Sequence, residues 1–119
     1  MLTLLVADDE FAVLEVVSMA LEAEGYRVLR AGDGVDALRI LSHHHCDVVI
    51  CDESMPAMDG YQLIAAMRAE PRHAQTAVVM LADTWGRPIP EVDGVVVLGK
   101  PIMLAELFAA VDKAARRGV

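Results

Sequence analysis

Five short apolar runs alternate with longer segments of helical period, and this alternation constrains the fold most. The runs are Thr3–Ala7, Tyr26–Arg30, Asp47–Cys51, Ala77–Leu81 and Val92–Leu98. Between the first two, Val13, Leu14 and Val17 recur at the spacing of one helix face. Strands and helices that alternate in this way form right-handed βαβ units with a parallel sheet. The pattern therefore predicts a single α/β domain over residues 1–119.

The segment between the fourth and fifth runs departs from this pattern. The other segments have regular helical spacing; residues 60–69 form one such segment, and another begins after Pro101. The fourth segment instead reads TWGRPIPEVDG, and its Pro88 and Pro90 lack the backbone N–H groups that a helix needs. We expect the helix there to be short, irregular or absent.

Composition excludes several classes of protein. A length of 119 residues with 55% hydrophobic content suits one core, and a net charge of −8 argues against direct nucleic-acid binding. No basic leader and no membrane-length apolar stretch is present, so we expect a cytoplasmic protein without membrane contact. In an extended strand Cys46 and Cys51 lie about 16 Å apart, too far for a disulfide.

Acidic residues follow two of the apolar runs. Asp8 and Asp9 come after the first run, and Asp52 comes after the third. Parallel sheets carry their sites at the carboxyl ends of the strands, so these carboxylates converge if the two strands are neighbours. Converging like charges favour a divalent cation, and hard oxygen ligands suit Mg²⁺. Lys100 follows the fifth run and could bind phosphoryl oxygens at the same edge.

Three motifs together resemble the receiver domain of two-component response regulators. They are ADDE after the first run, DESMPAMDG after the third and GKP after the fifth, and the resemblance covers the whole chain. It implies a flavodoxin-like, CheY-like fold with a five-stranded parallel sheet of order 2-1-3-4-5 and helices on both faces. Both a stand-alone receiver and a part of a longer regulator fit this pattern.

The resemblance also implies a role for each matching residue. Asp52 is the phosphoacceptor, Asp9 a direct Mg²⁺ ligand, Asp8 an acid acting through water, and the backbone carbonyl of Ser54 a further ligand. Lys100 binds the phosphoryl group and precedes a proline peptide bond that is cis in many relatives. The implied phosphate donor is a sensor histidine kinase, a histidine phosphotransfer protein or a small acyl phosphate. The implied target is a downstream protein or an output domain.

The chain departs from the family where phosphorylation is normally transmitted. Ala82 stands where relatives carry Thr or Ser, and Val97 replaces the aromatic switch residue. Alanine cannot donate the hydrogen bond that rewards the phosphorylated state. Asp83 would repel phosphate if it faced inward, and Thr84 is a weaker candidate for the missing hydroxyl. Our hypothesis is that the pocket keeps Mg²⁺ and phosphate but that its coupling to output is weak or follows another route.

Two other functions fit part of the sequence. A phosphate-independent, receiver-like binding module agrees with the substituted switch positions. An aspartate-nucleophile phosphatase would need a second acid two residues after Asp52, where Ser54 stands, so we expect no enzyme beyond phosphotransfer and self-dephosphorylation. Asp59 and Gly60 indicate a turn and a helix start, and Trp85 is either a lid over the site or an exposed residue.

Overall fold

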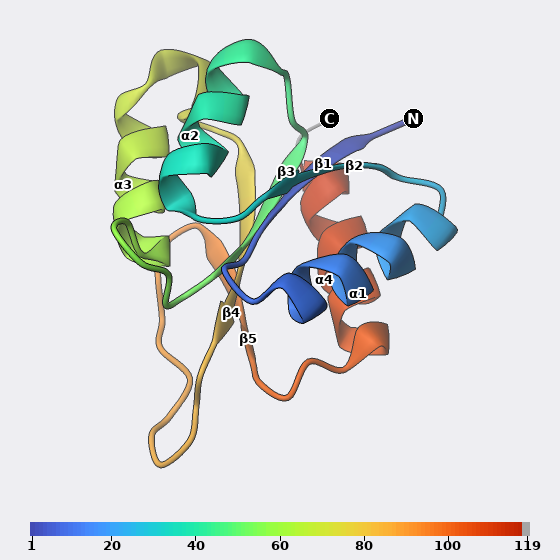
Figure 1. Ribbon diagram of the computed structural model, residues 1–119, viewed down its shortest axis with the longest axis vertical. Coiled ribbons are helices and arrows are strands. Elements are labelled where there is room, and N and C mark those ends of the chain that lie inside the picture. Colours follow the sequence, from blue (N-terminus) through green and yellow to red (C-terminus); the bar gives the residue numbers. More distant parts are fainter. Residues whose placement is uncertain (118–119) are drawn as a thin grey trace.

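A five-stranded parallel sheet in the order β2-β1-β3-β4-β5 forms the centre of the fold (Figure 1). The computed structural model describes residues 1–117. The strands are β1 Thr3–Ala7, β2 Arg27–Ala31, β3 Val48–Asp52, β4 Ala77–Ala82 and β5 Val95–Gly99. This order is the one implied by the family resemblance, so that prediction is confirmed.

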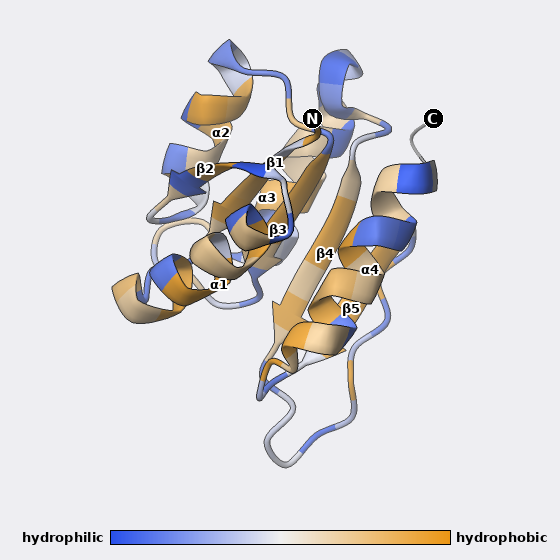
Figure 2. Cartoon of the chain, turned by 90° about the vertical axis from the view of Figure 1, so that its right-hand side faces the viewer, coloured by the Kyte–Doolittle hydropathy of each residue, from blue (hydrophilic) through white to orange (hydrophobic). Residues whose placement is uncertain are grey.

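Helices cover both faces of the sheet (Figure 1). In the described range they are α1 Phe11–Ala23, α2 Gly34–His43, α3 Gly60–Ala69 and α4 Leu104–Arg117, with a short 3₁₀ turn at Pro71–His73. Helices α1 and α4 pack on the side chains of one sheet face, and α2 and α3 pack on the other. The apolar strands therefore lie between two helical layers, as their near-continuous hydrophobicity predicts (Figure 2).

Two helix starts show how local sequence positions the elements. The carboxylate of Asp59 accepts from the backbone N–H of Gln62 at 2.8 Å, and the Gln62 side chain accepts from the Asp59 N–H at 2.9 Å. This capping box begins α3. The Asp33 carboxylate caps α2 with a single hydrogen bond, which it accepts from the N–H of Asp36 at 2.7 Å. The structural interpretation of Asp59 is thereby confirmed.

Strand boundaries differ from the prediction, most of all in β5. Strands β2 and β3 begin one residue later than expected, and β5 begins at Val95 instead of Val92. The N–H of Val95 donates to the carbonyl of Val92 at 3.1 Å, and Gly94 has φ +73°. The chain therefore turns immediately before the strand, and a sequence reading of hydrophobicity cannot detect that turn.

No helix occurs between β4 and β5 in the described part of the chain. Residues 83–94 form an irregular segment, which we name the β4–β5 loop, with a tight turn where the N–H of Arg87 donates to the Thr84 carbonyl at 3.0 Å. The expectation of a short, irregular or absent fourth helix is confirmed, because the helix is absent here. Without that helix, every residue of β5 is only half-buried.

Two further expectations concern membranes and cysteines. Across residues 1–117 no helix combines the length and apolar character required to cross a membrane. Cys46 and Cys51 are both buried as free thiols, and burial raises the pKa of Cys51 to about 12. Cys51 is thus a small buried side chain in β3.

Candidate functional site

Three carboxylates converge at the carboxyl ends of β1 and β3. These strands are neighbours, with Ala7 paired to Cys51, so Asp8 and Asp52 leave the sheet at the same edge. Single carboxylate oxygens of Asp8, Asp9 and Asp52 all lie within 4.8 Å of one another. Asp8 and Asp52 are buried, with 2% and 3% of their surfaces exposed, whereas Asp9 is open to solvent. The predicted acidic pocket therefore exists.

The environment of Asp8 fits a cation. Its Oδ1 accepts the N–H of Glu10 at 2.9 Å, while its Oδ2 is buried without a hydrogen-bond partner among the described residues. Burial raises the pKa of Asp8 to about 6, the Glu10 hydrogen bond partly offsets this, and Asp52 adds repulsion. A buried carboxylate oxygen without a donor is costly unless a positive charge approaches it. This donor set suits a hard cation such as Mg²⁺.

Lys100 reaches the same pocket from the end of β5. Its Nζ lies 2.7 Å from Oδ1 of Asp52. Burial raises the pKa of Asp52, and the Lys100 ammonium opposes that rise. For Lys100, burial alone would lower the pKa, but pairing with Asp52 outweighs it and the pKa is raised. The Lys100–Pro101 peptide bond is cis, the isomer that the family resemblance implies.

Glu53 is a functional candidate that the sequence did not reveal. It is buried, with 5% of its surface exposed, although it is a charged residue. Its Oε2 accepts the Tyr61 hydroxyl at 2.5 Å, and its Oε1 accepts the Asp83 N–H at 3.2 Å. The guanidinium of Arg87, in the β4–β5 loop, also pairs with Oε1. The only sequence signal was a second acid directly after Asp52.

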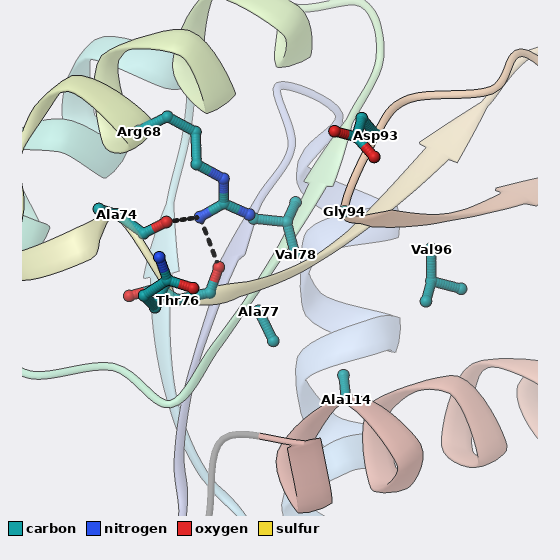
Figure 3. Close-up of a pocket in the computed structure, with 10 residues that line it drawn as sticks. Arg68, Ala74, Thr76, Ala77, Val78, Asp93, Gly94, Val96 and Ala114 are labelled. Carbon is teal, nitrogen blue, oxygen red and sulfur yellow. Dashed lines mark hydrogen bonds between the residues drawn. The ribbon is translucent and has the colours of Figure 1, made fainter.

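A separate depression of about 370 Å³ lies at the amino ends of β4 and β5, away from the carboxylates, and Figure 3 shows the residues that line it. It is lined by the first residues of β4 and by Arg68, whose Nη1 donates to the Thr76 carbonyl at 2.7 Å and the Ala74 carbonyl at 3.3 Å. These bonds tie the end of α3 to the start of β4. Arg68 therefore has a structural task, remote from the carboxylates.

Comparison with known proteins agrees with this geometry. Residues 4–112 match the response regulator receiver domain family. The chain belongs to this family. Its receiver fold also superimposes on the chemotaxis response regulator CheY4 of Vibrio cholerae with a TM-score of 0.86, at 30% identity over 96% of this chain and 98% of that one.

Two curated relatives from mycobacteria match nearly the whole receiver. The transcriptional regulatory protein PrrA of Mycobacterium tuberculosis is 31% identical over 95% of this chain and 49% of its own length. The response regulator MprA of Mycobacterium sp. strain KMS is 32% identical over 96% of this chain and 50% of its own length. The chain thus spans about half the length of these two relatives. Membership of the family makes it a receiver domain of two-component signalling.

The positions that the sequence singled out around the acidic pocket lie in different environments. Ala82 is buried at the end of β4 and Val97 is half-buried in β5. The exposed Asp83 carboxylate accepts the N–H of Trp85 at 3.0 Å, so it is engaged within the loop. The Thr84 hydroxyl donates to the Lys100 carbonyl at 3.5 Å, which links the loop to the site. A metal-binding role for the Ser54 carbonyl stays a prediction.

Proposed function

We propose that Asp52 is the phosphoacceptor of this receiver and that Lys100 binds the transferred phosphoryl group. One observation carries the proposal: Asp8, Asp9 and Asp52 converge within 4.8 Å and Lys100 lies 2.7 Å from Asp52. A carboxylate held at a strand end, with a cation beside it, is a positioned nucleophile. Lys100 supplies a point charge that suits phosphoryl oxygens.

The proposed reaction is a balanced group transfer. An Asp52 carboxylate oxygen attacks the phosphorus of a phosphohistidine or a small acyl phosphate and forms a new P–O bond. The bond from phosphorus to the donor nitrogen or oxygen breaks, and the leaving group keeps its electron pair. Water later attacks the phosphoaspartate and releases inorganic phosphate. Phosphotransfer and self-dephosphorylation are then the chemistry of the domain.

We propose Mg²⁺ as the cofactor, held by carboxylates of Asp8, Asp9 and Asp52 and by the Ser54 carbonyl. The unpartnered Oδ2 of Asp8 supports this assignment, because a buried lone oxygen benefits from a cation. When bound, the ion would neutralise charge on the phosphoryl oxygens. The Asp52 carboxylate supplies the nucleophilic oxygen, while the Lys100 ammonium balances the remaining negative charge.

The proposed partners follow from the family. A sensor histidine kinase or a histidine phosphotransfer protein would donate the phosphoryl group. Output would pass to a downstream protein or to an output domain, without direct nucleic-acid contact by this domain and without a membrane. We propose the cytoplasm as its compartment.

Intact-mass spectrometry after incubation with acetyl phosphate tests this function. The wild type should gain one phosphoryl group with Mg²⁺ and none with EDTA, and Asp52→Asn should gain none. Asp59→Asn is a matched control, because that carboxylate caps α3 outside the pocket. Absence of label under conditions that label a control receiver, with a cognate kinase also tried, would contradict the proposal.

A phosphate-independent binding module is the second candidate. The absence of a helix in the β4–β5 loop, together with Ala82 and Val97, favours it. This candidate predicts that Asp52→Asn leaves partner binding unchanged, whereas the first predicts a phosphate-dependent change.

A further inference from the structure

Glu53 points to the sheet face that a fourth helix would otherwise cover. Side chains of a strand alternate between faces, and Val49 and Cys51 pack on the α2–α3 side. Glu53 continues this alternation beyond the end of β3, and its contact with Tyr61 of α3 agrees with that direction. The acid therefore lies between α3 and the start of the β4–β5 loop.

The loop is fastened to this carboxylate by two groups. The Asp83 N–H and the Arg87 guanidinium both bind Oε1 of Glu53. Arg87 is bound to the loop itself, because its Nε donates to the Asp83 carbonyl at 2.8 Å. Glu53 thus fixes the first turn of the loop at both ends.

Ala82 and Thr84, the two residues that flank the Glu53-bound Asp83, contact the backbone of Lys100. The N–H of Lys100 donates to the Ala82 carbonyl at 2.9 Å, and the Thr84 hydroxyl donates to the Lys100 carbonyl at 3.5 Å. The methyl carbon of Thr84 would lie only 3.1 Å from a Cβ placed on Gly99, so loop and strand are closely packed. A displacement of Ala82 or Thr84 would therefore displace Lys100.

Charge pairing points in the same direction. Asp52 and Glu53 are adjacent buried carboxylates, and they have separate cations: Lys100 lies at Asp52 and Arg87 at Glu53. A buried carboxylate that loses its partner is strongly unfavourable and would attract any cation within reach. Each of the two buried carboxylates therefore has its own cation, and Lys100 is the one at Asp52.

We propose that Glu53 is a positioning residue for phosphorylation. Through Arg87 and the Asp83 N–H it holds the start of the β4–β5 loop, which contacts the backbone of Lys100. This inference rests on the proposed phosphorylation of Asp52. It gives the β4–β5 loop a task at the reaction site in a receiver that lacks a fourth helix.

Phosphorylation kinetics of Glu53→Gln, Arg87→Ala and the double variant test the proposal. Initial rates are measured against acetyl phosphate concentration at saturating Mg²⁺. Each single variant should lower the rate at limiting acetyl phosphate about tenfold, mainly through a higher half-saturating concentration. The double variant should be no slower than the singles, because both act through one contact. Arg87→Lys, which keeps a cation, should recover part of the rate.

Arg30→Ala is the matched control, because Arg30 pairs with Glu15 and Glu22 between β2 and α1. It should leave the phosphorylation rate unchanged. Urea unfolding of every variant identifies losses that arise from stability alone. Wild-type rates in folded Glu53→Gln or Arg87→Ala, additive losses in the double variant, or an equal loss in Arg30→Ala would overturn the inference. Failure of the wild type to accept phosphate would instead contradict the proposed function.

Discussion

The strand that carries the phosphoacceptor candidate and the strand that carries Lys100 are held in different ways. Every residue of β3 is buried, whereas every residue of β5 is only half-buried. Asp52 is thus fixed by apolar packing on both faces of the sheet. The backbone of Lys100 is held by polar contacts to the end of β4, at the Ala82 carbonyl, and to the Thr84 hydroxyl of the β4–β5 loop. That loop is anchored on Glu53. The site therefore combines a rigidly packed half with a half whose position depends on a few charged groups.

The largest expected effect comes from a substitution that disturbs the packing at the end of β3. A Cβ on Gly60 would lie 2.6 Å from the Asp52 carbonyl oxygen and 3.2 Å from the Glu53 Cα. Backbone atoms at these distances cannot yield without moving the strand end. Gly60→Ala should therefore lower the free energy of unfolding by about 3 kcal/mol and reduce phosphorylation. Urea unfolding and intact-mass labelling measure the two effects.

Gly32→Ala is the control for that substitution. A Cβ at Gly32 meets nothing within 4 Å, and its φ lies outside the left-handed region. Its free energy of unfolding should stay within about 0.5 kcal/mol of the wild type. Equal losses in the two variants would show that the contact with the strand end is not the cause.

A matched pair of valines compares the two halves directly. Val49 in β3 is 0% exposed, and Val97 in β5 is half-buried against the same hydrophobic cluster. Val49→Ala should cost about 2.5 kcal/mol of unfolding free energy and Val97→Ala about 1 kcal/mol, because only the first leaves an enclosed cavity. Chemical denaturation of both variants provides the measurement. Equal costs would mean that β5 is as tightly packed as β3.

The acid pocket should make the metal-free protein less stable as the pH rises. Asp8 has a pKa raised from 3.8 to about 6, so between these values the folded state binds more protons than the unfolded state. The free energy of unfolding contributed by Asp8 therefore falls as pH rises through this window and stays low above it. At pH 8 with EDTA, Asp8→Asn should be about 2 kcal/mol more stable than the wild type.

The pH dependence of that difference is the sharper measurement. Unfolding of wild type and Asp8→Asn at pH 8 and at pH 5 should show the advantage of the variant shrinking at the lower pH. Saturating Mg²⁺ should reverse the order at pH 8, because the ion stabilises only a folded state that binds it. A constant difference across pH, unaffected by Mg²⁺, would remove the buried charge as its cause.

The features that the sequence predicted correctly are those that a short stretch of sequence determines. The alternation of apolar runs predicted the parallel sheet, Pro88 and Pro90 predicted the lost helix, and acids at strand ends predicted the pocket. Each of these features depends on the backbone chemistry of single residues or on a periodicity of nearby residues, and both can be recognised in the sequence. The strand order itself came from the family resemblance.

Contacts across the loop could not be predicted in this way. Glu53 and Arg87 are 34 positions apart, and nothing local to either residue specifies that they pair. The early start assigned to β5 failed because Val92 has the residue type of a strand, whereas the turn at Gly94 depends on the folded backbone. Polar pairs between residues far apart in the chain therefore could not be predicted from the sequence around Lys100.

The smallest expected effect concerns Trp85, which the sequence left as either a lid or an exposed residue. The structure places it 93% exposed, so it does not cover the carboxylates. Its backbone N–H, not its indole, binds the Asp83 carboxylate. Trp85→Ala should therefore change the free energy of unfolding by less than about 0.5 kcal/mol and leave the rate of labelling by acetyl phosphate unchanged. A slower rate in a variant of unchanged stability would mean that the indole folds back over the site during transfer. The arrangement of Lys100 and the β4–β5 loop would then depend on an aromatic side chain as well as on Glu53.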